Sequence, residues 1–488
     1  MKKEYEMKEV ELNEMDQEKQ PMTGETPSGT EKNGCVKVKV PEDTEVKFTG
    51  LSKEELMKVA GTAGWVRTRW VLLVLFWLGW VGMLAGAIVI IVQAPRCKPI
   101  PEMNWWNEGP LYQISDVNAF SEKGLKGVEE KLDYLSHMNV KGLILGPIHT
   151  VEGNQLDTLD LVSVKSAVGT ENDLKSLLDQ AHKKGIPMVL NLTPSYDNTA
   201  VWFNNVTAVA EKIKDACTHW LKKGFGGIFL PDLRNIMTTK SWQSTQALFN
   251  KTEETKQVAL MGSFTNLSAD DVSLMLNRSG VDLLLTELLD PPETSVEKKL
   301  YPSHLQTSLG WTLGSLAFRS QAAPVRLYQM LLFTLPGTPV FSAGDEVGLK
   351  AGEKPQIMWD LENPAEEKNA TAKTLQEERI AVRNFFKTLS DLRGKERSLL
   401  HGEYVSLYSS ATSLAFLRLW DQSSRFLTAI NWGNASVIMN LSNSDLPAQA
   451  QVHLTTDAVN LAVDSMVSLE KLKLEPKQAV LFSYPYAG

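Results

Sequence analysis

Short apolar runs alternate with amphipathic stretches along the chain from about residue 104 to residue 390. Glycine, proline or polar residues bound these runs, which is the pattern of buried strands. Between two of them, the stretch 209–224 places Ile213, Cys217 and Trp220 on one face of a helix. The predicted strands are 111–114, 141–147, 187–192, 226–230, 258–263, 281–286, 307–313 and 339–344. Strands that alternate with helices in this number predict an α/β fold, a (β/α)8 TIM barrel over residues 104–390.

The pattern changes near residue 395, where strand-length runs follow one another without helices between them. The segments 413–420 and 425–433 are rich in Leu, Phe, Ile and Trp, which favour strands. They predict a C-terminal antiparallel β-sandwich over residues 391–488.

The N-terminal segment is polar and lacks the apolar runs of the later segments. Residues 1 to about 50 are rich in Glu, Lys, Thr, Gly and Pro, and such a composition cannot bury enough apolar surface to fold. A short helix is predicted at 51–61, because Ser52 and Glu55 form a capping box and Gly61 suits the helix end. We therefore expect a mostly disordered tail over residues 1–69, with one short helix close to its end.

The run from Trp70 to Val92 contains no charged residue. As a helix it is about 34 Å long, which exceeds a bilayer core of about 30 Å. It lies too far from the N-terminus and is too long to be a cleavable signal peptide. The basic residues near it are Lys53, Lys58, Arg67 and Arg69 before it, and Arg96 and Lys98 after it. The excess before the run predicts a type II protein, with residues 1–69 in the cytosol and everything beyond residue 92 outside.

Two further features belong to this region. Gly79, Gly82 and Gly86 follow a spacing that lets another helix approach closely, so they are predicted helix-packing positions. Beyond the span, prolines prevent the helix from continuing, and residues 93–103 are predicted to be an extracellular tether.

Charge and motifs exclude several function classes. The formal net charge is −8 and the pI is about 5.6, which argues against a nucleic-acid partner. No phosphate-binding glycine loop and no Cys/His metal spacing is present, so we expect neither cofactor nor metal. Three cysteines are too few for a disulfide framework, and Cys35 in the cytosolic tail should stay reduced.

Asn-x-Ser/Thr sequons accumulate in the part predicted to be extracellular, as expected for a glycoprotein. The favoured glycosylation sites lie in polar, loop-like surroundings and are Asn250, Asn266 and Asn369. The secondary candidates are Asn205, Asn277, Asn434 and Asn440.

The segments 105–114, 125–149 and 334–349 resemble the α-amylase/α-glucosidase family, and the likeness extends over nearly the whole ectodomain. The segment 105–114 (WWNEGPLYQI) is similar to the family's entry strand, and 125–149 is similar to its first helix and second strand. The segment 334–349 (TLPGTPVFSAGDEVGL) is nearly the family's last-strand sequence. This resemblance implies the same barrel fold.

The family's catalytic carboxylates are absent at the matching positions. The resemblance places Asn191 at an aspartate of the third strand, Pro231 at the nucleophile and Ser263 at the general acid. Leu316 stands at the third carboxylate. Because hydrolysis needs a nucleophile and a general acid together, the resemblance implies a barrel that is not an enzyme.

Nearby acids do not replace the missing ones. Asp232 is one residue late, and a one-residue slip points a strand side chain to the opposite face. Glu287 cannot supply both roles alone, and Asp345 and Glu346 match a family motif with a structural role.

A membrane-anchored chain with a hydrolase-like ectodomain resembles the heavy-subunit family of heteromeric amino acid transporters. The segments 7–14, 50–70, 76–92, 395–402 and 474–487 carry the likeness to the 4F2-antigen type of heavy chain. The other type has an extra subdomain after the third strand, for which residues 191–203 leave no room.

In that family a cysteine just outside the membrane forms a disulfide with the light chain, so the resemblance gives Cys97 this role. Cys97 lies five residues beyond Val92 in an oxidising compartment, between Arg96 and Lys98, which favour its thiolate. A disulfide to Cys217 and an unpaired thiol are the alternatives.

The resemblance implies a plasma-membrane subunit that stabilises and delivers a light chain. That partner, bound through Cys97 and the membrane helix, would exchange large neutral, cationic or anionic amino acids. Other cell-surface or cytosolic partners are left open. Two other functions compete: an active cell-surface glycosidase that uses Asp232, and a carbohydrate-binding or adhesion receptor that stacks sugars on Trp202, Trp311 or Tyr196.

Overall fold

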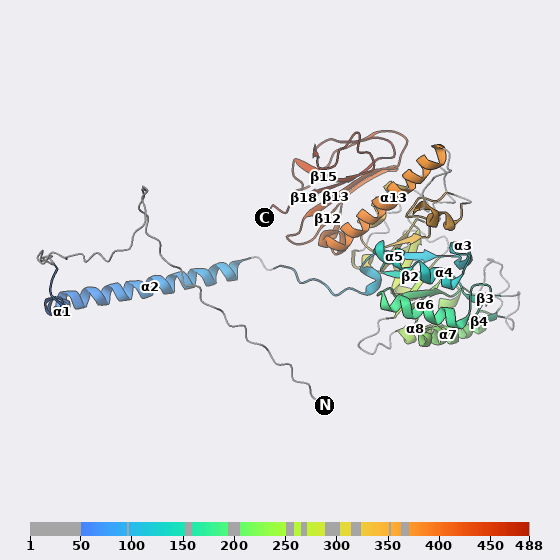
Figure 1. Cartoon of the computed structure of the whole chain (residues 1–488), viewed down its shortest axis with the longest axis horizontal. Coiled ribbons are helices and arrows are strands. Elements are labelled where there is room, and N and C mark those ends of the chain that lie inside the picture. Colours follow the sequence, from blue (N-terminus) through green and yellow to red (C-terminus); the bar gives the residue numbers. More distant parts are fainter. Residues whose placement is uncertain are drawn as a thin grey trace, which may run out of the picture. The chain divides into compact units, whose positions relative to one another are not determined.

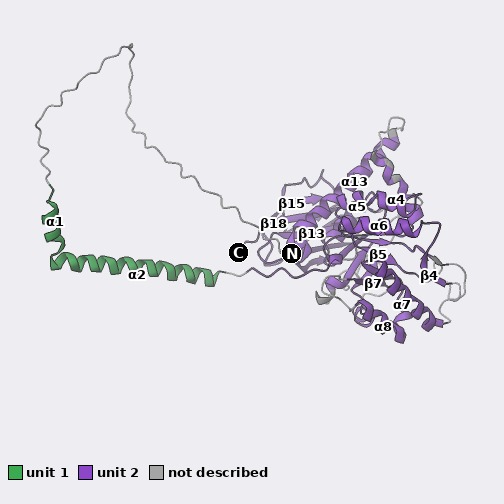
Figure 2. Cartoon of the chain, turned by 60° about the horizontal axis from the view of Figure 1, so that its bottom comes forward, with its two compact units in different colours: residues 1–95 green, residues 96–488 purple. Residues whose placement is uncertain are grey.

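The computed structural model describes most of the chain. The described residues are 50–94, 97–151, 159–193, 205–249, 258–264, 271–287, 303–313, 324–350, 353–362 and 370–487. They belong to two compact units, residues 1–95 and 96–488, which are coloured separately in Figure 2.

The described part of the first unit, residues 50–94, contains two helices. Helix α1 (Lys53–Ala60) has the predicted capping box, in which the Ser52 hydroxyl accepts the Glu55 amide and the Glu55 carboxylate accepts the Ser52 amide. Helix α2 (Ala63–Gln93) contains the predicted span but begins seven residues earlier. It is the one helix among the described residues that is long and apolar enough to cross a membrane, and every residue in it is exposed.

The second unit contains the predicted barrel. All neighbouring strands are parallel, and the sheet closes in the order β1-β10-β9-β8-β7-β6-β5-β2. Its strands are β1 (Leu111–Ile114), β2 (Gly142–Leu145), β5 (Met188–Asn191), β6 (Gly227–Leu230), β7 (Ala259–Ser263), β8 (Leu283–Glu287), β9 (Leu309–Thr312) and β10 (Thr338–Ser342). Each one lies in a predicted apolar run or overlaps it, so the barrel is confirmed.

Helices cover the outside of the barrel (Figure 1). The α-helices are α3 (Val117–Phe120), α4 (Leu125–Glu130), α5 (Leu132–His137), α6 (Glu171–Lys183), α7 (Val206–Lys223), α8 (Lys240–Phe249), α9 (Val272–Ser279), α12 (Val325–Thr334), α13 (Ala370–Lys395) and α14 (Arg397–Leu400). The 3-10 turns are η1 (Trp105–Asn107), η4 (Ile236–Thr238), η6 (Ser303–Ser308) and η7 (Pro355–Glu362). The sequence pattern did not predict the antiparallel hairpin of β3 (His149–Val151) and β4 (Leu159–Val164).

Apolar side chains fill the inside of the barrel. This inner cluster consists of Trp106, Leu111, Ile144, Val189, Phe229, Ala259, Met261, Leu283, Leu285 and Val340. A second, larger cluster lies between the strands and the surrounding helices. The interior is therefore a packed core, as in other TIM barrels, and leaves the strand ends as the place for a site.

The C-terminal part is antiparallel, as predicted. A six-stranded sheet has the order β11-β12-β13-β18-β15-β16, and β14 pairs with β17 in a separate ribbon. The strands are β11 (Glu403–Ser409), β12 (Ser413–Leu419), β13 (Arg425–Asn431), β14 (Val437–Met439), β15 (Gln449–Thr455), β16 (Met466–Ser468), β17 (Leu472–Leu474) and β18 (Ala479–Tyr484). One face of the sheet joins the core of the barrel helices, and the other packs on the ribbon.

Helix α13 runs alongside the sheet and across the predicted domain boundary at 390/391 (Figure 1). Near its end, Arg393 donates from Nη1 to the Phe333 and Leu335 carbonyls (2.6 and 2.9 Å) and from Nη2 to the Gly337 carbonyl (2.5 Å). These carbonyls close helix α12 and begin strand β10. The barrel is thereby joined to the elements that precede the sheet.

Arg418 on β12 makes the corresponding contacts from the sheet. It donates to the Thr334 carbonyl of α12 (2.6 Å) and twice to the Gly402 carbonyl (3.2 and 2.9 Å). Both arginines are only 1% exposed. Burial lowers the pKa of Arg393 to about 10, so the group remains charged at neutral pH.

Arg393→Met should destabilise the protein by about 3–5 kcal/mol, because it leaves two buried carbonyls and one partly buried carbonyl without this donor. Urea unfolding of the full chain in detergent, followed by tryptophan fluorescence, measures the change. Lys395→Met, at an exposed position on the same helix, should change the unfolding free energy by less than about 0.5 kcal/mol. Equal effects of the two substitutions would contradict this account.

Candidate functional site

The carboxyl ends of the barrel strands bring the predicted site residues to one mouth. Asn191, Ser263 and Glu287 are the last residues of β5, β7 and β8. Pro231 and Asp232 follow β6 directly. Leu316 lies outside the described residues. Three of the four degenerate positions are therefore found together at the end of the barrel where enzymes with this fold have their active sites.

The chain turns sharply at Asp232. This residue has a φ of +48°, which is uncommon for a residue other than glycine, and the next amide, of Leu233, donates to the Ser263 carbonyl (3.1 Å). Phe229, two residues before Pro231, is buried in the barrel interior. The end of β6 therefore carries the ring of Phe229 and the side chain of Pro231. Its carboxylate, that of Asp232, follows on a turn with a positive φ.

Three buried polar atoms from this region have no hydrogen-bond partner among the described residues. They are His149 Nδ1, Asn191 Oδ1 and Asp232 Oδ1. His149 Nε2 lies 2.7 Å from the Thr193 carbonyl, so Nε2 carries the proton and Nδ1 is the acceptor. Burial lowers the pKa of His149, which keeps the ring neutral. The sequence analysis did not identify His149.

Asp345 and Glu346, which follow β10, stabilise their own loop. The Ser342 amide donates to Asp345 Oδ2 (2.8 Å), and the Gly344 amide donates to Glu346 Oε2 (2.9 Å). Glu346 Oε1 also accepts hydrogen bonds from the hydroxyls of Tyr112 (2.8 Å) and Tyr134 (3.2 Å). Both acids are buried, as expected for the structural role that the sequence suggested.

Their burial also changes their acidity. It raises the pKa of Asp345 to about 7, and it raises the pKa of Glu346. A raised carboxyl pKa is a mark of a general acid in glycosidases. Here the raised pKa belongs to two acids, Asp345 and Glu346, whose carboxylates already accept hydrogen bonds from neighbouring amides and hydroxyls.

Cys97 is exposed, and both Cys97 and Cys217 are unpaired thiols. Cys217 is fully buried on α7, and burial raises its pKa to about 12. The alternative of a Cys97–Cys217 disulfide is therefore not present in this structure. The Lys98 amide, adjacent to Cys97, donates to Asp421 Oδ2 (3.1 Å) in the turn between β12 and β13.

Some of the predicted glycosylation sites lie among the described residues and others do not. Asn250, Asn266 and Asn369 lie outside the described residues. Asn205 is exposed and caps α7, where its Oδ1 accepts the Ala208 amide (3.2 Å). Asn277, Asn434 and Asn440 are exposed. Within the described ranges, no group of three or more His, Cys, Asp or Glu side chains is placed to hold a metal ion.

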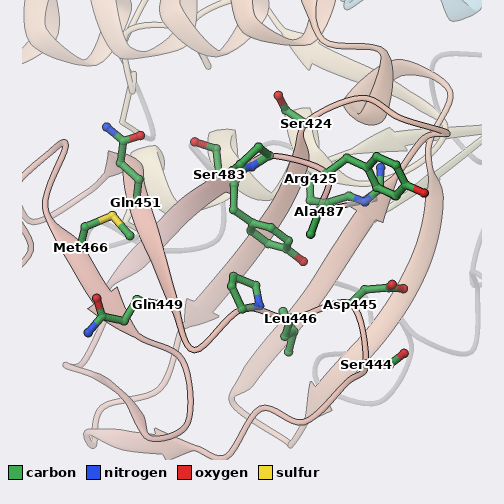
Figure 3. A pocket seen from close by; sticks show the side chains of 14 residues that line it. Ser424, Arg425, Ser444, Asp445, Leu446, Gln449, Gln451, Met466, Ser483 and Ala487 are labelled. Carbon is green, nitrogen blue, oxygen red and sulfur yellow. The ribbon is translucent and has the colours of Figure 1, made fainter.

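A groove of about 610 Å³ at one end of the C-terminal sheet was not predicted (Figure 3). Arg425 lies 4.7 Å from the centre of the Tyr486 ring, and the buried Tyr484 hydroxyl lacks a partner. The lining also includes Asp445, Leu446 and other residues from β15, β16 and the C-terminal segment. These residues are far apart in the sequence and carry no motif.

Comparison with known proteins decides the family. The chain is 41% identical to the amino acid transporter heavy chain SLC3A2 of Oryctolagus cuniculus over 526 aligned positions, which cover 99% of both chains. This chain belongs to the amino acid transporter heavy chain family. The SLC3A2 heavy chain of Rattus norvegicus is 40% identical over 99% of each chain. The SLC3A1 heavy chain of the same species is 24% identical over 94% of this chain and 90% of its own.

Two family models match consecutive parts of the chain. "Solute carrier family 3 member 2 N-terminus" matches residues 36–112, and "Alpha amylase, catalytic domain" matches residues 113–263. Among solved structures, the α-amylase of Geobacillus thermoleovorans has a TM-score of 0.56 at 19% identity, covering 79% of this chain and all of its own. This likeness concerns the fold, and it confirms the amylase-like barrel.

Replacement of Asp345 should alter the pH dependence of stability. The folded state raises the pKa of this acid to about 7, so the folded state binds the proton more tightly than the unfolded state. The contribution is present below about pH 4 and is lost as the pH rises to about 7. Relative to Asp345→Asn, which cannot ionise, the wild type should lose on the order of 4 kcal/mol once the pH has risen past both limits.

Urea unfolding at a series of pH values tests this expectation. Asp179→Asn, which removes an exposed acid on α6, serves as the control and should follow the wild type. A constant difference between wild type and Asp345→Asn over the whole range would show that Asp345 does not titrate as described.

Proposed function

We propose that this chain is the non-catalytic heavy subunit of a heteromeric amino acid transporter. In this role it anchors a multi-span light chain, stabilises it and delivers it to the plasma membrane. The observation that carries the proposal is the 41% identity to an SLC3A2 heavy chain, which extends over 99% of both chains and thus includes the membrane helix as well as the barrel.

The strand ends of the barrel support the absence of catalysis. Retaining glycosidases need two carboxyl groups about 5 Å apart, one as nucleophile and one as acid. Asn191, Pro231 and Ser263 occupy the matching strand ends and carry no carboxyl group. Asp345 and Glu346 have raised pKa values but hydrogen-bond to their own loop and its neighbours. An inert barrel agrees with a role in assembly.

The proposed topology places the N-terminus in the cytosol and residues beyond the span outside the cell. The excess of basic residues before residue 70 supports this orientation. A single apolar helix cannot form a polar pathway, because each polar group in lipid needs a partner. Transport therefore requires another subunit, which supports the ancillary role.

Cys97 is the proposed site of covalent attachment to the light chain. Its exposure and its position just beyond the membrane helix make it accessible to a neighbouring membrane protein. The other thiol of the described extracellular unit, Cys217, is buried and does not compete. Glycosylation is proposed at Asn250, Asn266 and Asn369 from their sequence context, and the exposure of Asn277, Asn434 and Asn440 supports these as further sites.

A Cys97→Ser variant should lose the covalent partner. On a non-reducing gel of intact cells, the wild type should run as a heavier species that reductant collapses, while the variant should run as the single chain. Cys217→Ser is the matched control and should leave the heavier species in place. A single band for the wild type in every lane would refute the covalent link.

The small-residue face of α2 is the proposed non-covalent contact. Gly79, Gly82 and Gly86 lie on one side of the helix, and a Cβ atom added at each would meet no atom within 4 Å. Packing among the described residues thus does not require glycine there. Close approach by a partner helix would require it.

Gly82→Leu should weaken association with the light chain several-fold, because the larger side chain separates the two helices. Ala87→Leu is a suitable control, since five residues place it about 140° round the helix from Gly82. Both changes are made in the Cys97→Ser background, and the light chain recovered with the heavy chain in mild detergent is measured. Equal recovery with both variants would count against this face.

A further inference from the structure

The extracellular unit holds the chain immediately after Cys97. The Lys98 amide donates to Asp421 Oδ2 at 3.1 Å, although the two residues are 323 positions apart. Lys98 Nζ also lies 3.5 Å from Glu403 Oε1, but these side chains are 58% and 72% exposed. Exposed ion pairs contribute little to stability, so the amide–carboxylate bond is the main contact.

The turn that carries Asp421 is itself held in place. Asp421 has a φ of +39°, a conformation that needs support in a residue other than glycine. Arg425 supplies it by donating from Nη1 to the carbonyls of Asp421 (2.6 Å) and Ser423 (2.8 Å). The buried Arg425 side chain lies in turn against the Tyr486 ring. Figure 3 shows Arg425 at the rim of the groove, close to Ser424 and Ala487.

We propose that Asp421, supported by Arg425, is a positioning residue for Cys97. By binding the adjacent amide, it holds the thiol at a defined place on the extracellular unit, ready for the disulfide with the light chain. This inference rests on the proposed function, because it assumes that Cys97 forms that bond.

The effect of this hydrogen bond on the volume that Cys97 can reach, and so on the rate of disulfide formation, can be estimated from the chain geometry. With the Lys98 amide held, the Cα atom of Cys97 stays within about 3.8 Å of a fixed point. Without that bond, the first half-buried residue is Met103, and the six intervening steps span roughly 13 Å as a flexible coil. The accessible volume then grows by roughly fortyfold, since it scales as the cube of this distance. A clamp of one hydrogen bond is open part of the time, so we expect a three- to tenfold effect on the rate.

The covalent step is a thiol–disulfide exchange. The Cys97 thiolate attacks the light-chain sulfur of a mixed disulfide between the light-chain cysteine and a secretory oxidoreductase. A new sulfur–sulfur bond forms, the old one breaks, and the oxidoreductase leaves as a thiolate. The oxidoreductase thus supplies the oxidising equivalent, and Asp421 affects only how often the Cys97 thiolate is in place.

Two substitutions remove the clamp from opposite sides. Asp421→Gly deletes the acceptor and tolerates the positive φ, whereas Lys98→Pro deletes the donor amide and leaves the acid. Each should slow the appearance of the disulfide-linked species three- to tenfold in a pulse-chase experiment on the full chain with its light chain. The double variant should be no slower than either single variant, because both remove one bond.

Conservative variants separate positioning from folding. Asp421→Asn keeps an oxygen acceptor and tolerates the turn, so it should retain the wild-type rate within about twofold. Lys98→Arg keeps both the amide and the positive charge beside the thiol and should behave in the same way. Labelling of Cys97 by a small soluble maleimide should be equally fast in the wild type, Asp421→Gly, Asp421→Asn and Lys98→Arg, since each keeps that charge and the thiol is exposed.

The outcomes are distinguishable. If the wild type forms no linked species, the proposed covalent function fails. If the wild type links and both Asp421→Gly and Lys98→Pro link equally fast, the positioning role is wrong. If Asp421→Asn is as slow as Asp421→Gly, or if the two single effects multiply in the double variant, the amide–carboxylate bond is not the cause and the proposal is overturned.

Discussion

Two buried guanidinium groups hold the end of helix α12, and the unit of residues 96–488 depends on them. Arg393 and Arg418 reach the same segment, residues 333–337, one from α13 and the other from strand β12. Unpaired carbonyls at a buried helix end are costly, so each arginine satisfies a need that the barrel alone leaves open. Because both arginines lie after the predicted domain boundary at 390/391 and these acceptors lie before it, the contacts join the barrel and the sheet into one body.

These contacts are compatible with the proposed non-catalytic role of the barrel. The inner core remains packed, with Phe229 and Met261 among its side chains, and the acids after β10 stabilise their loop. Holding the residues around Lys98 in place does not require catalysis at the strand ends of the barrel. The contact between Lys98 and Asp421 places the start of the second unit on the turn between β12 and β13, beside the proposed point of covalent attachment.

The sequence predicted the barrel well, because each strand is a short apolar run whose burial decides its place. It failed where a structure depends on few or distant residues. Strand β3 has only three residues and begins with His149, so no periodicity revealed its hairpin. The Lys98–Asp421 contact and the Arg425–Tyr486 pair join positions that no local pattern connects. Among the site residues, Asn191 and Ser263 end strands and Pro231 follows one, whereas the buried polar atoms for which no partner is found among the described residues emerge only in three dimensions.

The most direct test of the central claim is amino acid uptake by cells that lack a heavy chain of their own. A light chain is expressed alone or with this chain, and sodium-independent uptake of large neutral, cationic and anionic amino acids is measured together with the surface fraction of the light chain. The account predicts that surface light chain and uptake rise together only when both chains are present, and that an α-glucosidase inhibitor changes neither. Equal surface delivery and uptake without this chain would contradict it.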